Sequence, residues 1–178
     1  MRAAIVLPVA VALLFSTAAC QSAGETSARV GEGGWKSVEI EDFTVAWLEM
    51  EDSYRFTVTA PTSGWVAIGF GGGPAMKDAA IVIGYSLDGE GFIRDDHGTS
   101  PVAHAPDTEL GGSSDISEYG VREVDGSTEM TFVIPADPED QLDPALAPET
   151  TLRVLVAHGE QDDFTGMHSA AHSAEITL

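Results

Sequence analysis

The stretch GWVAIGFGGGPAMKDAAIVIGYS, residues Gly64–Ser86, decides the fold of this chain. It consists of two apolar runs, Trp65–Phe70 and Ile81–Tyr85, joined by a turn with consecutive glycines. Strands that are covered on both faces show such near-continuous apolar runs, so both are expected at the centre of a sheet. The turn carries one thioether, that of Met76, where a rigid sheet could present it to a ligand.

Short strand patterns continue on both sides of this stretch. Gly, Pro, Asp and Ser separate them, and no long helical stripe appears. Tyr54–Thr59 alternates polar and apolar residues, so its strand is expected to be half exposed. The pattern predicts an all-β sandwich of two sheets, with strands at Val38–Ile40, Phe43–Glu49, Tyr54–Ala60, Trp65–Phe70, Ala79–Leu87, Gly91–Asp95, Ile116–Val124, Glu129–Ile134, Thr151–Ala157 and Ala174–Leu178.

Two longer segments are predicted to be irregular. Asp96–Ser114 is polar and interrupted by Pro and Gly, and Asp137–Thr150 is rich in Pro and could contain a short helical turn. His97 and His104 fall in the first segment and are expected to be solvated. The acidic pairs at 95–96 and 162–163 could bind calcium, but EF-hand spacing is absent and loop carboxylates are usually just solvated.

The N-terminus has the pattern of an export signal. Met1–Arg2 supplies one positive charge, an apolar run follows, and two small residues precede Cys20. Residues 1–19 are expected to be a signal peptide, and the Cys20 thiol to be lipidated as in a bacterial lipoprotein. Such a protein is anchored to a membrane without spanning it. Residues 20–34 then form the anchor cysteine and a flexible tether, and 35–178 form one domain.

Composition excludes several cofactors and partners. Cys20 is the only cysteine, whereas covalent haem attachment, iron–sulfur clusters and blue-copper centres all need cysteine ligands. The formal net charge is −21, with only 8 Lys and Arg residues. Nucleic acids and anionic lipid surfaces select cationic patches, so neither is an expected partner. The acidity would suit a basic redox partner or a saline habitat.

The segment DDFTGMHSAAH, Asp162–His172, adds imidazoles to the thioether of Met76. A thioether is soft and favours ferrous iron, whereas imidazole binds both oxidation states, so the pair suggests a Met/His metal or haem site suited to electron transfer. The same donors also suit copper, for which the candidates are Met76, Met167, His168 and His172. The hydrolase motifs GxSxG and HExxH are absent from the sequence, so an enzyme is not expected.

The motifs of the chain, taken in order, resemble those of a DOMON domain. The resemblance covers roughly Trp35–Leu178 and rests on the whole ordered set more than on any single motif. The set comprises WVAIGFG (Trp65–Gly71), MKDA (Met76–Ala79), IVIGY (Ile81–Tyr85), RDDHG (Arg94–Gly98), LGG (Leu110–Gly112), AHG (Ala157–Gly159) and Asp163-Phe164 ahead of His168.

This resemblance implies an immunoglobulin-like antiparallel β-sandwich that holds either non-covalent haem b or a sugar at one end. In haem-binding members, similar to the cytochrome domain of cellobiose dehydrogenase, the axial ligands are a methionine after the glycine-rich strand and a histidine near the C-terminus. Carried over, these are Met76 and His168. Members often have Arg-Gly four residues after the ligand histidine, where this chain has His172-Ser173, so His172 is an alternative ligand.

Further residues are expected around the haem. Gly72 and Gly73 carry no side chain, so their backbone could lie close to a porphyrin edge. The Lys77 amine could replace the thioether as ligand or pair with a haem propionate. The expected apolar walls are Trp65, Phe70, Tyr85 and Phe164.

The leading hypothesis is therefore an exported, lipid-anchored b-type cytochrome. It would pass single electrons between a redox donor and a redox acceptor in the extracytoplasmic space. The first alternative is a carbohydrate-binding module without haem, in which Trp65 or another exposed aromatic residue stacks on sugar rings. The second alternative is a copper-binding protein.

Overall fold

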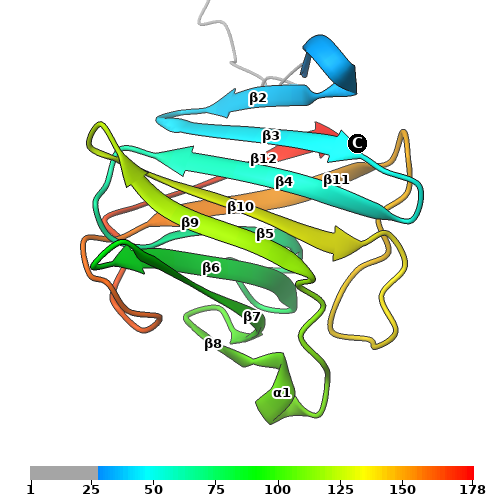
Figure 1. Cartoon of the computed structure of the whole chain (residues 1–178). Coiled ribbons are helices and arrows are strands. Elements are labelled where there is room, and N and C mark those ends of the chain that lie inside the picture. The colour runs from blue at the N-terminus through cyan, green and yellow to red at the C-terminus, as the bar shows by residue number, and fades with distance from the viewer. Residues whose placement is uncertain (1–27) are drawn as a thin grey trace, which may run out of the picture.

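Two antiparallel sheets pack face to face in the computed structural model, which describes residues 28–178 (Figure 1). The first sheet has the order β1 (Arg29–Val30), β2 (Lys36–Ile40), β3 (Phe43–Glu49), β4 (Ser53–Ala60), β10 (Ser127–Pro135) and β9 (Glu118–Val124). The second has the order β12 (Ala170–Thr177), β11 (Thr151–His158), β5 (Val66–Gly71), β6 (Ala79–Leu87), β7 (Glu90–Ser100) and β8 (Ala103–Pro106). The predicted all-β sandwich is confirmed, and β1 and β8 are additional short strands.

The predicted signal peptide and the predicted lipidation of Cys20 lie outside the described residues. The last part of the predicted tether contains β1 and a 3₁₀ helix at Glu32–Gly34. Within residues 28–178, no helix has both the length and the apolar character needed to cross a bilayer.

The main core lies between the two sheets. Phe56 of β4 is fully buried there, with its ring 4.9 Å from that of Phe70 on β5 and 5.7 Å from that of Phe132 on β10. Residues of β4 alternate between this core and a partly exposed face, as the sequence predicts. Val66 and Ile68 of β5 point into the same core as Phe70.

A second apolar cluster covers the opposite face of the second sheet. Ala67 of β5 and Ile81 and Ile83 of β6 belong to it, together with Trp65 and Ala79. Strands β5 and β6 therefore lie inside their sheet and are covered on both faces, which confirms the expectation drawn from their continuous apolar runs. Side chains from the β5–β6 turn and from the connection between β11 and β12 complete this outer cover.

The β5–β6 turn is fixed against β7. The Asp78 amide donates a hydrogen bond to the Gly98 carbonyl at 2.7 Å. A Cβ at Gly98 would lie 1.7 Å from the Met76 carbonyl oxygen, so only glycine lets the turn approach the strand this closely. From β11, Arg153 Nη1 donates to the carbonyls of Gly73 at 2.8 Å and Ala75 at 3.1 Å.

The prediction of an irregular segment at Asp96–Ser114 is wrong for most of its length, up to Leu110. Strand β7 continues to Ser100, β8 pairs with it, and the short helix α1 (Asp107–Leu110) follows. Two polar residues of β7 satisfy each other: Arg94 and Asp96 lie two residues apart and form an ion pair. Polar composition therefore reflects local pairing here, not a loop.

The contact between Gly98 and the Met76 carbonyl predicts a specific sensitivity to added volume. Gly98→Ala should lower the free energy of unfolding by about 1–3 kcal/mol, because the methyl group forces the turn away from β7. It should also speed tryptic cleavage after Lys77, which lies in that turn. Urea denaturation and limited proteolysis of the exported chain carrying Cys20→Ser measure both effects.

The matched control is Gly120→Ala on β9, where an added Cβ meets no atom within 4 Å. That variant should behave like the parent chain. Equal stability and equal cleavage of the Gly98→Ala and Gly120→Ala variants would contradict the proposed contact.

Candidate functional site

A pocket opens on the outer face of the second sheet, above β5, β6 and β11. Its cavity volume is about 70 Å³, and its mouth opens to solvent. The lining residues are Trp65, Ala67, Gly69, Met76, Ile81, Ile83, His104, Leu155, Val156, Ala157 and His168.

Met76 and His168 both line this pocket, although 92 positions separate them (168 − 76). Met76 is half-buried and lies in the turn that Gly98 and Arg153 hold in place. His168 is exposed and precedes β12, where the Ser169 amide donates to the His158 carbonyl at 2.7 Å. The structure thus brings the two predicted ligands to one cavity, and iron binding by them stays a prediction.

The connection that carries His168 is built around Trp65. The indole is 4% exposed, and a Cβ at Gly159 would lie 2.3 Å from its Nε1, so the backbone packs directly against the ring. The Asp163 carboxylate accepts a hydrogen bond from the Thr165 amide at 2.7 Å. Backbone donors at Thr165 and Gly166 lower the pKa of Asp163, which keeps this turn-forming carboxylate ionised.

A charged network borders the pocket. Arg94 donates to both carboxylate oxygens of Asp96, Nε to Oδ1 at 2.6 Å and Nη2 to Oδ2 at 2.7 Å. His104 Nδ1 is hydrogen-bonded to Asp96 Oδ2. Burial alone would raise the pKa of Asp96, but the bonds from His104 and Arg94 outweigh it and hold that pKa below its ordinary value. A buried, ionised Asp96 therefore orients both side chains.

The expectation that His104 is solvated is wrong. Strand β8 pairs with the edge of β7, and this pairing brings the imidazole to the pocket wall beside Asp96. The period-2 spacing of Arg94 and Asp96 could have indicated a strand with a polar face. No comparable local signal marks His104, because its neighbours are set by sheet pairing. His97 is half-buried, and its Nδ1 is bonded to the Leu142 carbonyl at 2.9 Å, so it is not simply solvated either.

Three of the four expected wall residues belong to the apolar cluster around the pocket. Trp65 lines it directly. Tyr85 and Phe164 belong to the same outer apolar cluster, with ring centroids 4.8 Å apart. The guanidinium of Arg94 lies 4.5 Å from the centre of the Phe164 ring, a cation–π contact that joins the charged network to the aromatic pair.

The structure does not bring the other expected residues to the pocket. Phe70 points into the main core, because neighbouring residues of a strand face opposite sides. His172 pairs in register with Val156, and its ring lies 6.0 Å from that of Phe43, on the core side of the sheet. Lys77 is exposed and forms an ion pair with Asp78 at 2.7 Å.

Gly72 and Gly73 do not line the pocket either. They belong to the β5–β6 turn. Gly71 and Gly72 have φ values of +71° and +81°, which other residues adopt only with strain. A Cβ at Gly72 would lie 2.8 Å from that of Ala79. These glycines are therefore explained by the turn itself.

The fold is similar to those of two solved cytochrome domains. The cytochrome b domain of pyranose dehydrogenase from Coprinopsis cinerea superposes with a TM-score of 0.59 at 13% identity, over 86% of this chain and 88% of that chain. The cytochrome domain of Myriococcum thermophilum cellobiose dehydrogenase superposes with a TM-score of 0.57 at 9% identity, over the same shares of both chains, 86% and 88%. At such identities the likeness shows the fold alone.

Comparison with curated protein sequences gave no match. The family model of the DOMON domain matches residues 39–159, which is more than half of the chain and spans the strands that form the pocket. The chain therefore belongs to the DOMON domain family.

Proposed function

We propose that this DOMON domain binds haem b without a covalent bond and carries single electrons, with Met76 and His168 as the axial ligands. One observation carries the proposal: a thioether and an imidazole from distant parts of the chain line one apolar pocket. Similarity of the fold to two cytochrome domains supports it.

The residues present fit the group. Besides Met76 and His168, only Trp65 and His104 among the lining residues carry heteroatoms in their side chains, and the rest are aliphatic or glycine. An apolar wall with soft sulfur and imidazole donors suits a porphyrin iron. When bound, haem would supply one-electron redox chemistry. Ligation by protein on both sides would disfavour oxygen binding.

The surrounding residues would position the ligands and exclude water. Arg153 and Gly98 hold the Met76 turn close to the sheet. The Trp65 indole packs against Gly159 and Gly166 at the two ends of the segment that leads to His168. Asp96 fixes His104 at the edge of the pocket. Rigid ligands suit an electron carrier, because electron transfer is faster when the geometry around the redox centre changes little between its oxidation states.

Sugar or copper binding has less support. The indole of Trp65 is only 4% exposed, so it offers no open face for stacking on a sugar ring. The four candidate copper ligands do not converge: the Met167 side chain is 84% exposed, and His172 lies on the core side of the sheet.

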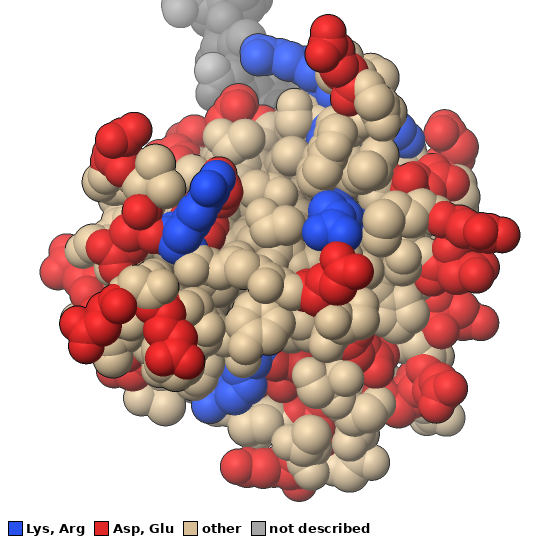
Figure 2. Space-filling model, viewed as in Figure 1, with Lys and Arg blue, Asp and Glu red and all other residues tan. Residues whose placement is uncertain are grey.

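The partner would be a redox protein in the extracytoplasmic space, reached after export and anchoring through Cys20. Figure 2 shows acidic side chains spread over the visible face, with few Lys and Arg among them. With a formal net charge of −21, the domain would associate fastest with a partner that presents a basic surface. It would act as a carrier, not as an enzyme.

The absorbance spectrum tests the proposal. The chain with Cys20→Ser, exported in a haem-replete host, should show a sharp Soret band and resolved α and β bands after reduction. Met76→Ala should remove the low-spin reduced spectrum, and His168→Ala should abolish haem retention, because each removes one axial ligand.

Two matched substitutions serve as controls. Met167→Leu and His172→Ala should keep the parent spectrum, since Met167 is exposed and His172 faces the core. A protein that stays colourless after hemin addition would exclude the haem proposal. A spectrum lost in His172→Ala but kept in His168→Ala would reverse the histidine assignment.

Arg153 provides a second test, of positioning. Arg153→Ala should weaken hemin binding by about tenfold or more, because the carbonyls of the Met76 turn lose their common donor. Arg122→Ala on β9 is the control, since that exposed arginine pairs with Glu129 on the other sheet. Hemin titration followed by absorbance measures both affinities, and equal affinities would contradict a positioning role for Arg153.

A further inference from the structure

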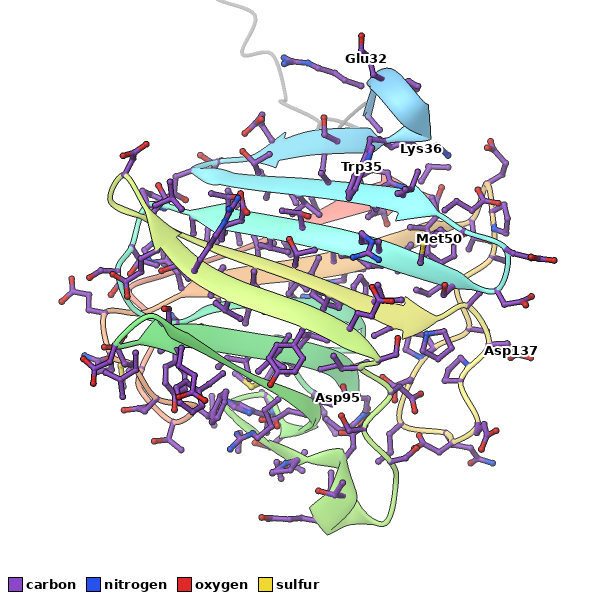
Figure 3. The ribbon with its side chains drawn as sticks, viewed as in Figure 1. Glu32, Trp35, Lys36, Met50, Asp95 and Asp137 are labelled. Carbon is purple, nitrogen blue, oxygen red and sulfur yellow. The ribbon has the colours of Figure 1, made fainter. Side chains whose placement is uncertain are left out.

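Three carboxylates meet at the end of the sandwich that carries α1. Asp95 comes from β7, Asp107 from α1, and Asp143 from the connection between β10 and β11 (Figure 3 labels Asp95). One oxygen of each lies within 4.8 Å of the others. Strand alternation turns Asp95 to the face opposite Asp96, so this cluster is separate from the charged network beside the pocket.

Asp107 is the unusual member of the cluster. The residue is 0% exposed, and no N–H or hydroxyl group donates to either of its carboxylate oxygens. The only polar contact of its side chain that bears on its pKa is with another acid, the Asp143 carboxyl group. A buried carboxylate without compensation is costly, so a residue in this state calls for a ligand. Asp143 and the adjacent Asp115 each contribute one more buried oxygen without a partner, and all of these atoms belong to the same acidic group.

Other acidic residues nearby are satisfied in ordinary ways. Asp140 Oδ1 accepts from the Leu142 amide at 2.8 Å, and its Oδ2 accepts from the Ser113 amide at 2.8 Å. Asp95 Oδ2 accepts from the Asp115 amide at 2.7 Å. Backbone capping therefore explains Asp140 fully and Asp95 in part, and it leaves Asp107 unexplained.

Positive charge is missing from the cluster. Among the ion pairs within residues 28–178, none includes Asp95, Asp107 or Asp143. Arg94, the nearest arginine along β7, is committed to Asp96 on the other face. The ring of His97 lies near enough to Asp143 to affect its pKa, but its Nδ1 is already hydrogen-bonded to the Leu142 carbonyl.

Crowding and burial raise the pKa values of the carboxyl groups in this cluster. Burial, opposed by the Asp115 amide and assisted by neighbouring carboxylates, raises the pKa of Asp95 to about 7. Burial first, and repulsion second, also raise the pKa values of Asp107 and Asp143. Either a cation or shared protons must relieve this repulsion.

We propose that Asp95, Asp107 and Asp143, with Asp115 beside them, bind one hard divalent cation of the calcium class. Calcium takes six to eight oxygen ligands at about 2.3–2.6 Å, so oxygens on opposite sides of the ion lie about 5 Å apart. Because one oxygen of each carboxylate lies within 4.8 Å of the other two, the three fit around a common centre. An all-oxygen set favours a hard cation over softer metals, and calcium tolerates a less regular arrangement of ligands than the strict octahedron of magnesium.

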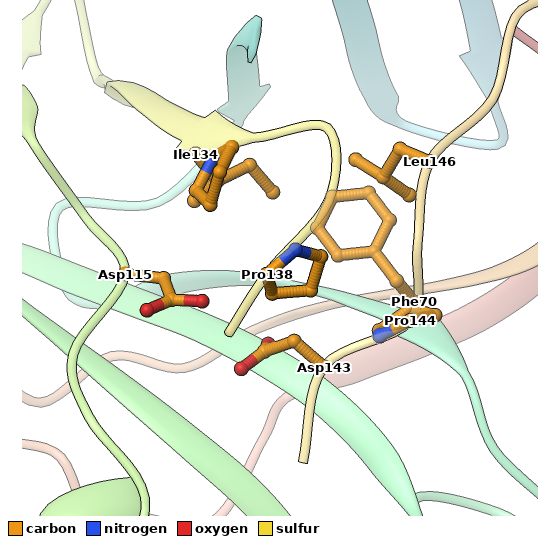
Figure 4. Close-up of a pocket in the computed structure, with 8 residues that line it drawn as sticks. Phe70, Asp115, Ile134, Pro138, Asp143, Pro144 and Leu146 are labelled. Atoms are coloured by element: carbon orange, nitrogen blue, oxygen red, sulfur yellow. The ribbon is translucent and has the colours of Figure 1, made fainter. Parts of the chain in front are cut away.

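The surroundings of the site explain what the ion would do. Figure 4 shows the carboxylates of Asp115 and Asp143 turned toward the space between them, with Phe70 and Leu146 on the apolar side of the neighbouring pocket. Since the ligands come from β7, α1 and the β10–β11 connection, the ion would tie α1 and that connection to the second sheet.

Calcium titration of the full chain carrying Cys20→Ser tests the proposal, after removal of metal with a chelator. Isothermal calorimetry should show one calcium per chain. Calcium at about 100 times its dissociation constant should raise the melting temperature by about 5 °C or more. Asp107→Asn should lose this shift, whereas Asp162→Asn, which removes one charge from the exposed connection before His168, should keep it.

Folding of the variant is checked separately. In chelator, Asp107→Asn should melt at or above the parent temperature, because the substitution relieves repulsion. If it does not fold, Asp143→Asn replaces it with the same expectation. The haem-free chain and the hemin-loaded chain should both respond, so failure of haem binding does not affect the outcome.

Two results would overturn the proposal. One is a parent chain whose melting temperature is the same in calcium and in chelator, with no binding heat, which would assign the cluster to shared protons. The other is an equal calcium shift in the parent and in both Asp107→Asn and Asp143→Asn, which would place the ion elsewhere.

Discussion

Strands β5 and β6 are apolar on both faces, and the rest of the structure follows from the need to cover both. The first sheet covers the inner face through residues such as Phe56. The outer face is covered by the Met76 turn and by the connection before β12. This outer cover is incomplete, and the gap is the pocket that Met76 and His168 line. The segments that cover the central strands therefore also form the site. Met76 lies on the β5–β6 turn, and His168 lies on the connection before β12.

Much of this organisation was predictable, and the misses have physical causes. The Gly64–Ser86 pattern predicts two central strands and a turn that presents Met76, because a long apolar run has few alternatives. The same run does not tell which alternate residues face the core, so the expectation that Phe70 lines the site is wrong. His104 was unpredictable in principle, since its place depends on pairing between β7 and β8 and on a bond to Asp96. Tertiary pairing, and not local propensity, decides such edge strands.

The two faces of strand β7 place aspartate side chains in different electrostatic environments. Asp96 faces the outer side, where Arg94 and His104 satisfy it and keep it ionised. Asp95 faces the other side, where its neighbours are further carboxylates and its pKa is raised to about 7. The pKa values of these two adjacent aspartates therefore shift in opposite directions, because neighbouring side chains of a strand face opposite sides of the sheet. Sequence reasoning that treats the pair as one acidic unit misses this difference.

The same strand connects the proposed ion to the proposed haem site mechanically. The Met76 turn rests on Gly98, three positions after Asp95 on β7. Asp95 in turn belongs to the cluster that joins β7 to α1 and to the β10–β11 connection. A cation there would hold β7 in place from the core side, while the turn presses on it from the outer side. Its role would then be structural, because it touches no residue of the pocket, and it would act by keeping the strand rigid beneath the thioether. In a domain with a formal net charge of −21, one buried divalent ion would also offset repulsion where carboxylates are most crowded.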